Sequence, residues 1–172
     1  RKYSCKPDLA AHEEITRRSA SEGMVLLKND SQCLPLKGND AEVALFGLGS
    51  YDLLATGSGS GNVTGSHVIS VSQGLENAGF ELDPALKDFN QKYVDFEKVN
   101  LRASAQNSMI LGESKVPEAP ISRSFIDAQV AASDIAIVVL GRNSGEGSDR
   151  KVDNDFNLSD AERQMLNDVT SA

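Results

Sequence analysis

The fold is decided by the stretch Ile135–Leu140, which reads IAIVVL. An uninterrupted apolar run of this length is typical of a strand that is covered on both faces. Such strands belong to parallel sheets that carry helices on each side. Ser122 can cap a helix before this stretch, and Ser159-Asp160-Ala161-Glu162 has the capping-box pattern that opens a helix after it. The sequence therefore predicts an α/β fold.

Three further strands are predicted upstream, at Met24–Leu27, Val43–Gly47 and Phe80–Leu82. The strongest strand, Ile135–Leu140, is separated from the last residue, Ala172, by a single predicted helix. A doubly wound sheet would continue with another strand after that helix. We therefore expect the sheet to be incomplete at the C-terminal end of residues 1–172.

Helices are expected between these strands. Asp8 can cap an amphipathic helix that Gly23 closes, and another helix is expected over 70–78. The polar, loosely periodic stretch 84–111 predicts a long helix or a helix pair. Residues 112–120 include two prolines and predict a surface connection.

Composition and charge exclude several function classes. The chain has 25 acidic and 17 basic residues, a formal charge of −8, so a nucleic-acid partner, which needs a basic patch, is excluded. No stretch approaches the roughly 20 apolar residues of a membrane span. Cys5 and Cys33 have no ligand-spaced histidines nearby, so no metal site is predicted, and free thiols are favoured over a disulfide.

Chemistry is expected in the loops that follow strands, because ligands of parallel sheets bind at the carboxyl ends of the strands. The first such loop contains Gly57-Ser58-Gly59-Ser60-Gly61, whose backbone amides could cradle an anion. A dinucleotide fingerprint read from Gly47 fails, however, because Asp52 stands at its last glycine position. A flexible or tightly turned loop is the favoured interpretation, and no cofactor is predicted.

The second loop, 141–150, reads GRNSGEGSDR and places Glu146 between two glycines. The small neighbours let its carboxylate project from the sheet, where it could serve as a general acid. The alternative is that Glu146 and Asp149 are solvated charges paired with Arg142 or Arg150. Spacing alone leaves both interpretations open.

Several motifs together resemble the second domain of glycoside hydrolase family 3. They are EGMVLLKN at 22–29, LPL at 34–36, VALFG at 43–47 and GSGSGNV at 57–63, in matching order and spacing, with GRNSGEGSDR at 141–150 resembling the acid/base loop of the family. The resemblance covers most of the chain except residues 84–120.

The resemblance implies a β-glucosidase or a related exo-acting enzyme. In that family a TIM-like barrel supplies an aspartate nucleophile, and a six-stranded α/β sandwich of mostly parallel strands supplies the acid/base. Residues 1–172 are then one sandwich domain or its N-terminal part. The barrel is not in this chain, because its aspartate-tryptophan motif cannot occur in a sequence without tryptophan. The parent protein resembles the subgroup in which the sandwich precedes the barrel.

The implied function is retaining hydrolysis of terminal β-linked sugars, with Glu146 as acid/base. Arg142, Asn143 and Arg150 are candidates for orienting the loop or binding a sugar hydroxyl. The expected partners are a β-linked oligosaccharide or glycoside, the missing barrel and, through an exposed sheet edge, a second copy of the chain. The chain alone is expected to be inactive. A periplasmic or secreted location is expected, with the cytoplasm as the alternative.

Two other classes of function stay open from the sequence. The chain could be a nucleotide-binding α/β module that uses the glycine-rich loop. It could instead be a non-catalytic partner-binding domain that uses its sheet edge or its last helix.

Overall fold

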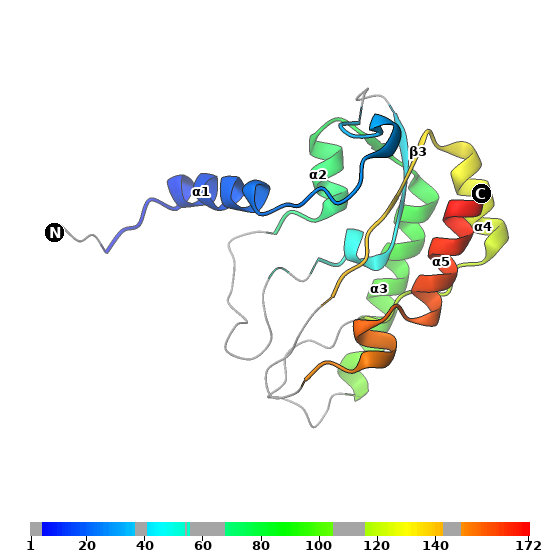
Figure 1. Cartoon of the computed structure of the whole chain (residues 1–172). Coiled ribbons are helices and arrows are strands. Elements are labelled where there is room, and N and C mark those ends of the chain that lie inside the picture. The colour runs from blue at the N-terminus through cyan, green and yellow to red at the C-terminus, as the bar shows by residue number, and fades with distance from the viewer. Residues whose placement is uncertain (1–4, 37–40, 54, 56–67, 105–115, 143–148) are drawn as a thin grey trace. The chain divides into compact units, whose positions relative to one another are not determined.

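A computed structural model of the chain describes residues 5–36, 41–53, 55, 68–104, 116–142 and 149–172 (Figure 1). The chain divides into two compact units, Arg1–Lys37 and Gly38–Ala172. No described helix is long and apolar enough to cross a bilayer.

The first unit contains helix α1, Leu9–Glu22. The Asp8 carboxylate accepts a hydrogen bond from the backbone N–H of Ala11 at 3.1 Å and so caps the helix, which Gly23 ends. Both boundaries agree with the sequence prediction. A short 3-10 turn, Asp30–Gln32, follows. Cys5 and Cys33 are exposed free thiols.

The strand predicted at Met24–Leu27 is not formed. This segment has no strand assignment, and its side chains are 64–92% exposed. An isolated strand is unstable in water, because its backbone and its apolar face both need a neighbour. The described part of the first unit contains no strand that could pair with this segment. The segment is apolar, as the sequence shows, but an apolar run of this length does not reveal whether a neighbouring strand exists.

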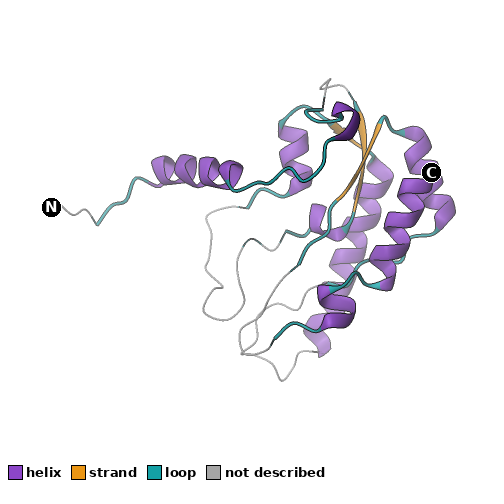
Figure 2. Ribbon diagram, viewed as in Figure 1, coloured by secondary structure: helices purple, strands orange, loops and turns teal. Residues whose placement is uncertain are grey.

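The second unit is built on a three-stranded parallel sheet in the order β2-β1-β3 (Figure 2). The strands are β1 (Glu42–Phe46), β2 (Glu81–Leu82) and β3 (Ile135–Val138). Val43 of β1 faces Leu82 of β2 on one side and Ile135 of β3 on the other. The predicted α/β class is confirmed, and all described strand pairs are parallel.

The core is centred on β1, whose residues Val43–Phe46 are fully buried. Ala44 and Phe46 project from the same face of the strand, as residues two apart do. They pack against Leu86, Ile126 and Met165, which come from three different helices. Those helices, α3, α4 and α5, therefore cover this face of the sheet (Figure 1).

Strand β3 departs from the prediction in two respects. It ends at Val138 instead of Leu140, and its residues are only partly buried, with Ala136 exposed. The reason is its position: among the described residues β3 pairs with β1 alone, whereas β1 has a strand on each side. Its continuous apolar sequence indicated a buried strand but did not distinguish a central strand from an edge strand.

The described part of the second unit contains four α-helices, two of which begin directly after the caps that the sequence predicts, Ser122 and Ser159. They are α2 (Val71–Asn77), α3 (Pro84–Ser104), α4 (Arg123–Ala132) and α5 (Asp160–Ser171). Ser70 and Ser159 each close a capping box, and Ser122 accepts a hydrogen bond from a backbone amide at the start of α4. An irregular turn, Val152–Phe156, precedes α5.

The stretch 112–120 was predicted to be a surface connection, and this is wrong for its described part. Val116 and Ala119 are only 4% and 1% exposed. Val116 packs with Leu48 and Val94, on the turn after β1 and on α3. Val116 and Ala119 are buried while Pro117 and Pro120 are exposed, so a proline-containing segment lines the core without regular structure.

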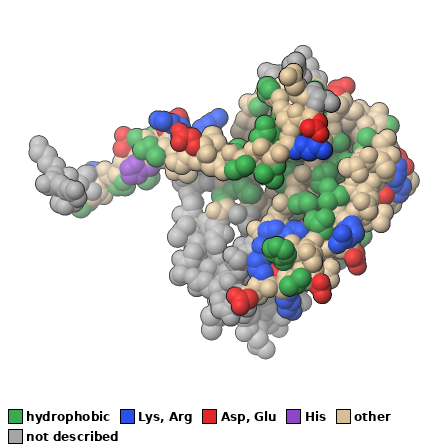
Figure 3. Space-filling model, viewed as in Figure 1, with side chains coloured by type: hydrophobic (Ala, Val, Ile, Leu, Met, Phe, Trp, Pro, Cys, Tyr) green, Lys and Arg blue, Asp and Glu red, His purple; other side chains and the backbone are tan. Residues whose placement is uncertain are grey.

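We expect the isolated chain to associate with itself. Apolar side chains gather on the surface over β3 (Figure 3), and an edge strand of this kind can pair with a second copy. Sedimentation velocity at tens of micromolar should show dimers or larger species. Ala136→Lys on β3 should reduce the association, whereas Ala128→Lys, on the exposed part of α4, should not. A monodisperse monomer with a reversible melt would contradict this expectation.

Candidate functional site

The site lies where β1 and β3 end, at the carboxyl edge of the sheet. Gly47 follows β1 with φ of 89°, a conformation that side-chain-bearing residues rarely adopt. A Cβ atom at this position would overlap the carbonyl oxygen of Val139. Glycine is therefore required here for two reasons, backbone conformation and the close approach of the segment after β3. The 3-10 turn Leu48–Ser50 follows directly.

Tyr51 stabilises this turn through a hydrogen bond to β1. Its hydroxyl donates a hydrogen bond to the carbonyl oxygen of Leu45, at 2.9 Å. Burial, followed by the negative charges of Asp83 and Glu76, raises the pKa of Tyr51 above its ordinary value. The phenol stays protonated and keeps its donor role at any working pH.

Glu118 also stabilises this turn, through a contact with Leu48. Its two carboxylate oxygens accept the backbone N–H of Leu48 at 3.2 and 3.1 Å. This charge-assisted bond satisfies an amide that the turn leaves free. It also ties the segment 116–120 to the residues that follow β1.

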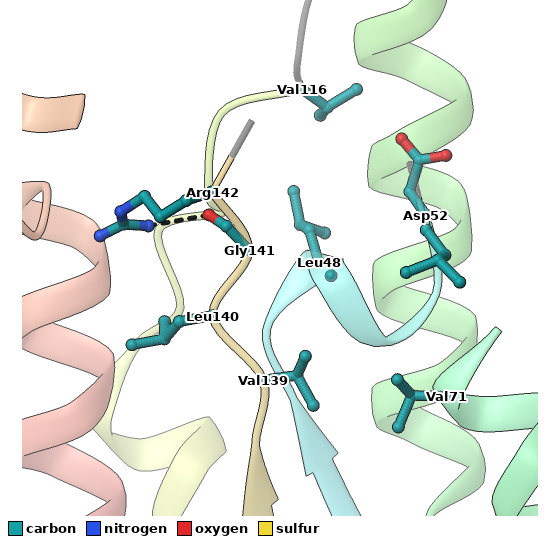
Figure 4. A pocket seen from close by; sticks show the side chains of 10 residues that line it. Leu48, Asp52, Val71, Val116, Val139, Leu140, Gly141 and Arg142 are labelled. Carbon is teal, nitrogen blue, oxygen red and sulfur yellow. Dashed lines mark hydrogen bonds between the residues drawn. The ribbon is translucent and has the colours of Figure 1, made fainter. Parts of the chain in front are cut away.

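Between these segments is a small cavity of about 210 Å³. Leu48 and Val139 project toward it from the ends of β1 and β3, and Val71 and Val116 border it (Figure 4). Asp52 stands at its rim beside α3, where it forms an ion pair with Lys98 at 2.5 Å. The lining residues are Leu48, Gly49, Asp52, Leu53, Val71, Val116, Val139, Leu140, Gly141 and Arg142. The cavity is mainly apolar, with one acidic and one basic residue at its rim.

Arg142, a predicted site residue, is bound to the buried residue Glu162. Its guanidinium makes two hydrogen bonds to Glu162 of α5, Nη1 to Oε1 at 2.5 Å and Nη2 to Oε2 at 2.9 Å. Nη1 also donates to the carbonyl oxygen of Gly141 at 2.9 Å (Figure 4). The hydrogen bond with Glu162 raises the pKa of Arg142. The guanidinium lies on the side of the chain away from Leu48 (Figure 4).

Arg150, the predicted residue at the other end of the loop, pairs with Asp155. Its Nε lies 3.3 Å from Oδ1 of Asp155, and its Nη2 donates to the Asp155 carbonyl oxygen at 2.9 Å. The second oxygen, Oδ2, accepts the backbone N–H of Lys151 at 3.0 Å. The two arginines therefore anchor the ends of the stretch 143–148, and sugar binding by either of them stays a prediction.

Other predicted residues lie outside the described residues. These are Glu146 and Asn143 in the second loop and the glycines Gly57, Gly59 and Gly61 in the first. Their roles stay predictions. Among the residues that the structure describes, no group of three or more His, Cys, Asp or Glu side chains is placed to hold a metal ion.

Sequence reasoning missed Glu118 and Glu162 as residues that shape this site. Glu162 was identified only as the last residue of a capping box, and that role is confirmed. Its pairing with Arg142 spans 20 residues, and that of Glu118 with Leu48 spans 70. No local pattern signals contacts of this range, so the sequence offered no means of finding them.

Known proteins are similar to this chain in both sequence and architecture. A family model described as Glycosyl hydrolase family 3 C-terminal domain matches residues 24–172. Beta-glucosidase A of Butyrivibrio fibrisolvens is 34% identical over 145 residues, which are 82% of this chain and 16% of that protein. This chain thus spans about a sixth of that relative's length.

Solved structures agree with these sequence matches. Beta-glucosidase 3B from Thermotoga neapolitana, in complex with α-D-glucose, superposes with a TM-score of 0.84 at 34% identity, covering 98% of this chain and 23% of that one. A beta-glucosidase from Paenibacillus barengoltzii gives a TM-score of 0.84 at 26% identity, covering 99% of this chain and 18% of that one. The chain belongs to glycosyl hydrolase family 3 and corresponds to the C-terminal domain of that family.

Proposed function

We propose that this chain supplies the acid/base half of the active site of a retaining, exo-acting β-glycosidase of the β-glucosidase type. The observation that carries the proposal is the position of Gly141 and Arg142, which begin the stretch 141–150 and line the cavity beyond the end of β3. This stretch contains Glu146 and resembles the acid/base loop of the family. Relatives named beta-glucosidase, one of them bound to glucose, support a terminal β-linked glucoside as the substrate class.

The proposed reaction has two half-reactions that share one carboxyl group. Glu146 donates its proton to the glycosidic oxygen as the bond to the leaving group breaks, while an aspartate of the barrel forms the covalent glycosyl-enzyme. Glu146, now a carboxylate, then removes a proton from the water that attacks this intermediate. In retaining enzymes the two carboxyl groups stand roughly 5 Å apart, so the barrel must dock against this edge of the sheet.

The remaining parts of the enzyme belong to the same proposal. The parallel three-stranded sheet would be part of a six-stranded sandwich, with its other strands and the barrel outside residues 1–172. The share of the Thermotoga neapolitana enzyme that this chain covers, 23%, is consistent with such a division. The side of β3 that no strand of the described residues occupies is where a further strand could pair.

The test compares the isolated chain with the same chain joined to its barrel. The 172-residue chain should give no turnover of an aryl β-glucoside above the uncatalysed rate, because one carboxyl group of the pair is absent. The joined protein should hydrolyse it. Turnover by the pure chain that survives Glu146→Ala would contradict the proposal. A folded joined protein without glycosidase activity would favour a non-catalytic partner-binding domain.

A further inference from the structure

The attachment of Arg142 to α5 is more elaborate than an ordinary surface ion pair. Its guanidinium engages both oxygens of Glu162, the fork-to-fork geometry that fixes direction as well as distance. The Glu162 side chain is only 4% exposed, and that of Arg142 is 25% exposed. A buried carboxylate that loses its cation is strongly disfavoured, so this pair resists opening.

Glu162 is itself held in place. Its Oε2 accepts the backbone N–H of Ser159 at 2.8 Å, and its own N–H donates to the Ser159 hydroxyl at 3.2 Å. Three residues later along α5, Met165 is buried in the main core at 2% exposure. The carboxylate that receives Arg142 therefore belongs to the rigid part of the second unit.

Arg142 lies directly before the stretch 143–148, four residues after β3 ends at Val138. Its third hydrogen bond, to the carbonyl oxygen of Gly141, fixes the backbone at that point. Arg150 anchors the other end, but that pair is less buried, with side chains 30% and 37% exposed. The Arg142–Glu162 pair, here called the stem clamp, is the stronger of the two anchors.

We propose that Arg142 and Glu162 are positioning residues, and that the stem clamp fixes the backbone from which the chain enters the acid/base loop. This inference rests on the proposed function, because it assigns the clamp a role in aligning Glu146. A positioned general acid contributes only when it lies within hydrogen-bond reach of the leaving oxygen. Releasing the stem should therefore weaken proton donation in particular, while sugar binding by the barrel is retained.

The test uses the full-length protein and two substrates. Glu162→Gln keeps the size and the Ser159 contact but removes the charge that holds Arg142. It should lower kcat/KM about 100-fold on methyl β-glucoside, whose leaving group needs a proton, since misplacing a catalytic group by about 1 Å can cost that much. On 2,4-dinitrophenyl β-glucoside, whose leaving group needs no proton, the loss in kcat/KM, which reports the first half-reaction alone, should be under about 5-fold. On methyl β-glucoside the loss should lie in kcat, with KM changed less than about 3-fold.

Two further variants control for folding. Ser159→Ala removes the capping hydroxyl of α5 but leaves the backbone N–H that contacts Glu162, and it should leave the ratio of the two rates near that of the parent. Arg142→Lys keeps the positive charge but cannot form both hydrogen bonds to the Glu162 carboxylate. It should shift the ratio of the two rates in the same direction as Glu162→Gln, but to a smaller extent. Because both rates come from one sample, the ratio does not depend on the folded fraction.

The outcomes separate the clamp from the proposed function. If Glu146→Ala is selective for the poor leaving group while Glu162→Gln and Arg142→Lys lower both rates equally or not at all, the stem clamp has no positioning role and the proposed function stands. If Glu146→Ala itself shows no selectivity, the acid/base assignment fails and the inference fails with it.

Discussion

Glu146→Ala in the full-length protein should lower kcat/KM by about 10² to 10⁴-fold on substrates with poor leaving groups, the usual contribution of a positioned general acid. An activated aryl glucoside should lose much less in the first half-reaction, because its leaving group departs without a proton. Measuring kcat/KM across aryl glucosides of graded leaving-group pKa checks this. The slope of log kcat/KM against that pKa should become steeper in the variant.

Azide should rescue the second half-reaction of the same variant. Once the glycosyl-enzyme forms, its hydrolysis needs a base to activate water, whereas azide attacks without one. Turnover of the activated substrate should rise with azide concentration and yield a glycosyl azide that retains the β configuration. Equal losses on good and poor leaving groups, without rescue by azide, would assign the acid/base to another residue.

Gly47→Ala should destabilise the second unit by about 3 kcal/mol or more. Gly47 has φ of 89° and ψ of 132°. Holding an L-residue in so sparsely populated a backbone region costs roughly 1–3 kcal/mol, and overpacking against neighbouring atoms typically costs another 1–3 kcal/mol. The new Cβ would overlap the Val139 carbonyl, which is backbone and cannot rotate away. Urea unfolding followed by circular dichroism, with all variants at one protein concentration, gives the change.

Gly74→Ala is the matched control for this substitution. Gly74 lies within α2, and a Cβ built there meets no atom within 4 Å. The same chemical change should stabilise the unit by up to about 1 kcal/mol, because alanine is the better helix former. A loss below about 1 kcal/mol for Gly47→Ala would contradict this expectation and would mean that the segment after β3 moves away from residue 47 at little cost.

The accuracy of the sequence predictions depended on how local each signal was. Ser122 and Ser159 were correctly identified as caps, because a cap acts within three residues of itself. The prediction of a strand at Met24–Leu27 was wrong, because a strand needs a pairing partner, which a local apolar pattern does not reveal. Val116 was expected at the surface and is buried, since proline content describes the backbone and not what packs upon it.

The candidate site shows the same division. The general position, at the carboxyl ends of β1 and β3, followed from the order of strands and loops. The partners of Arg142 and Arg150 did not, because the sequence offers several carboxylates at similar spacing and only the packing of α5 selects Glu162. The assignment of Glu146 rests on the family motif, and its geometry lies outside the described residues.

The pairing of the central strand with β3 has a consequence for the newly synthesised protein. The Glu42 backbone N–H, at the start of β1, bonds to the Asp134 carboxylate, 92 residues later. At about 5–20 residues per second, a ribosome needs on the order of 5–20 s to make that intervening chain. During this interval the apolar strand Val43–Phe46 has emerged, but its neighbour β3 has not. The nascent chain therefore exposes apolar surface that is prone to aggregate until β3 has been made.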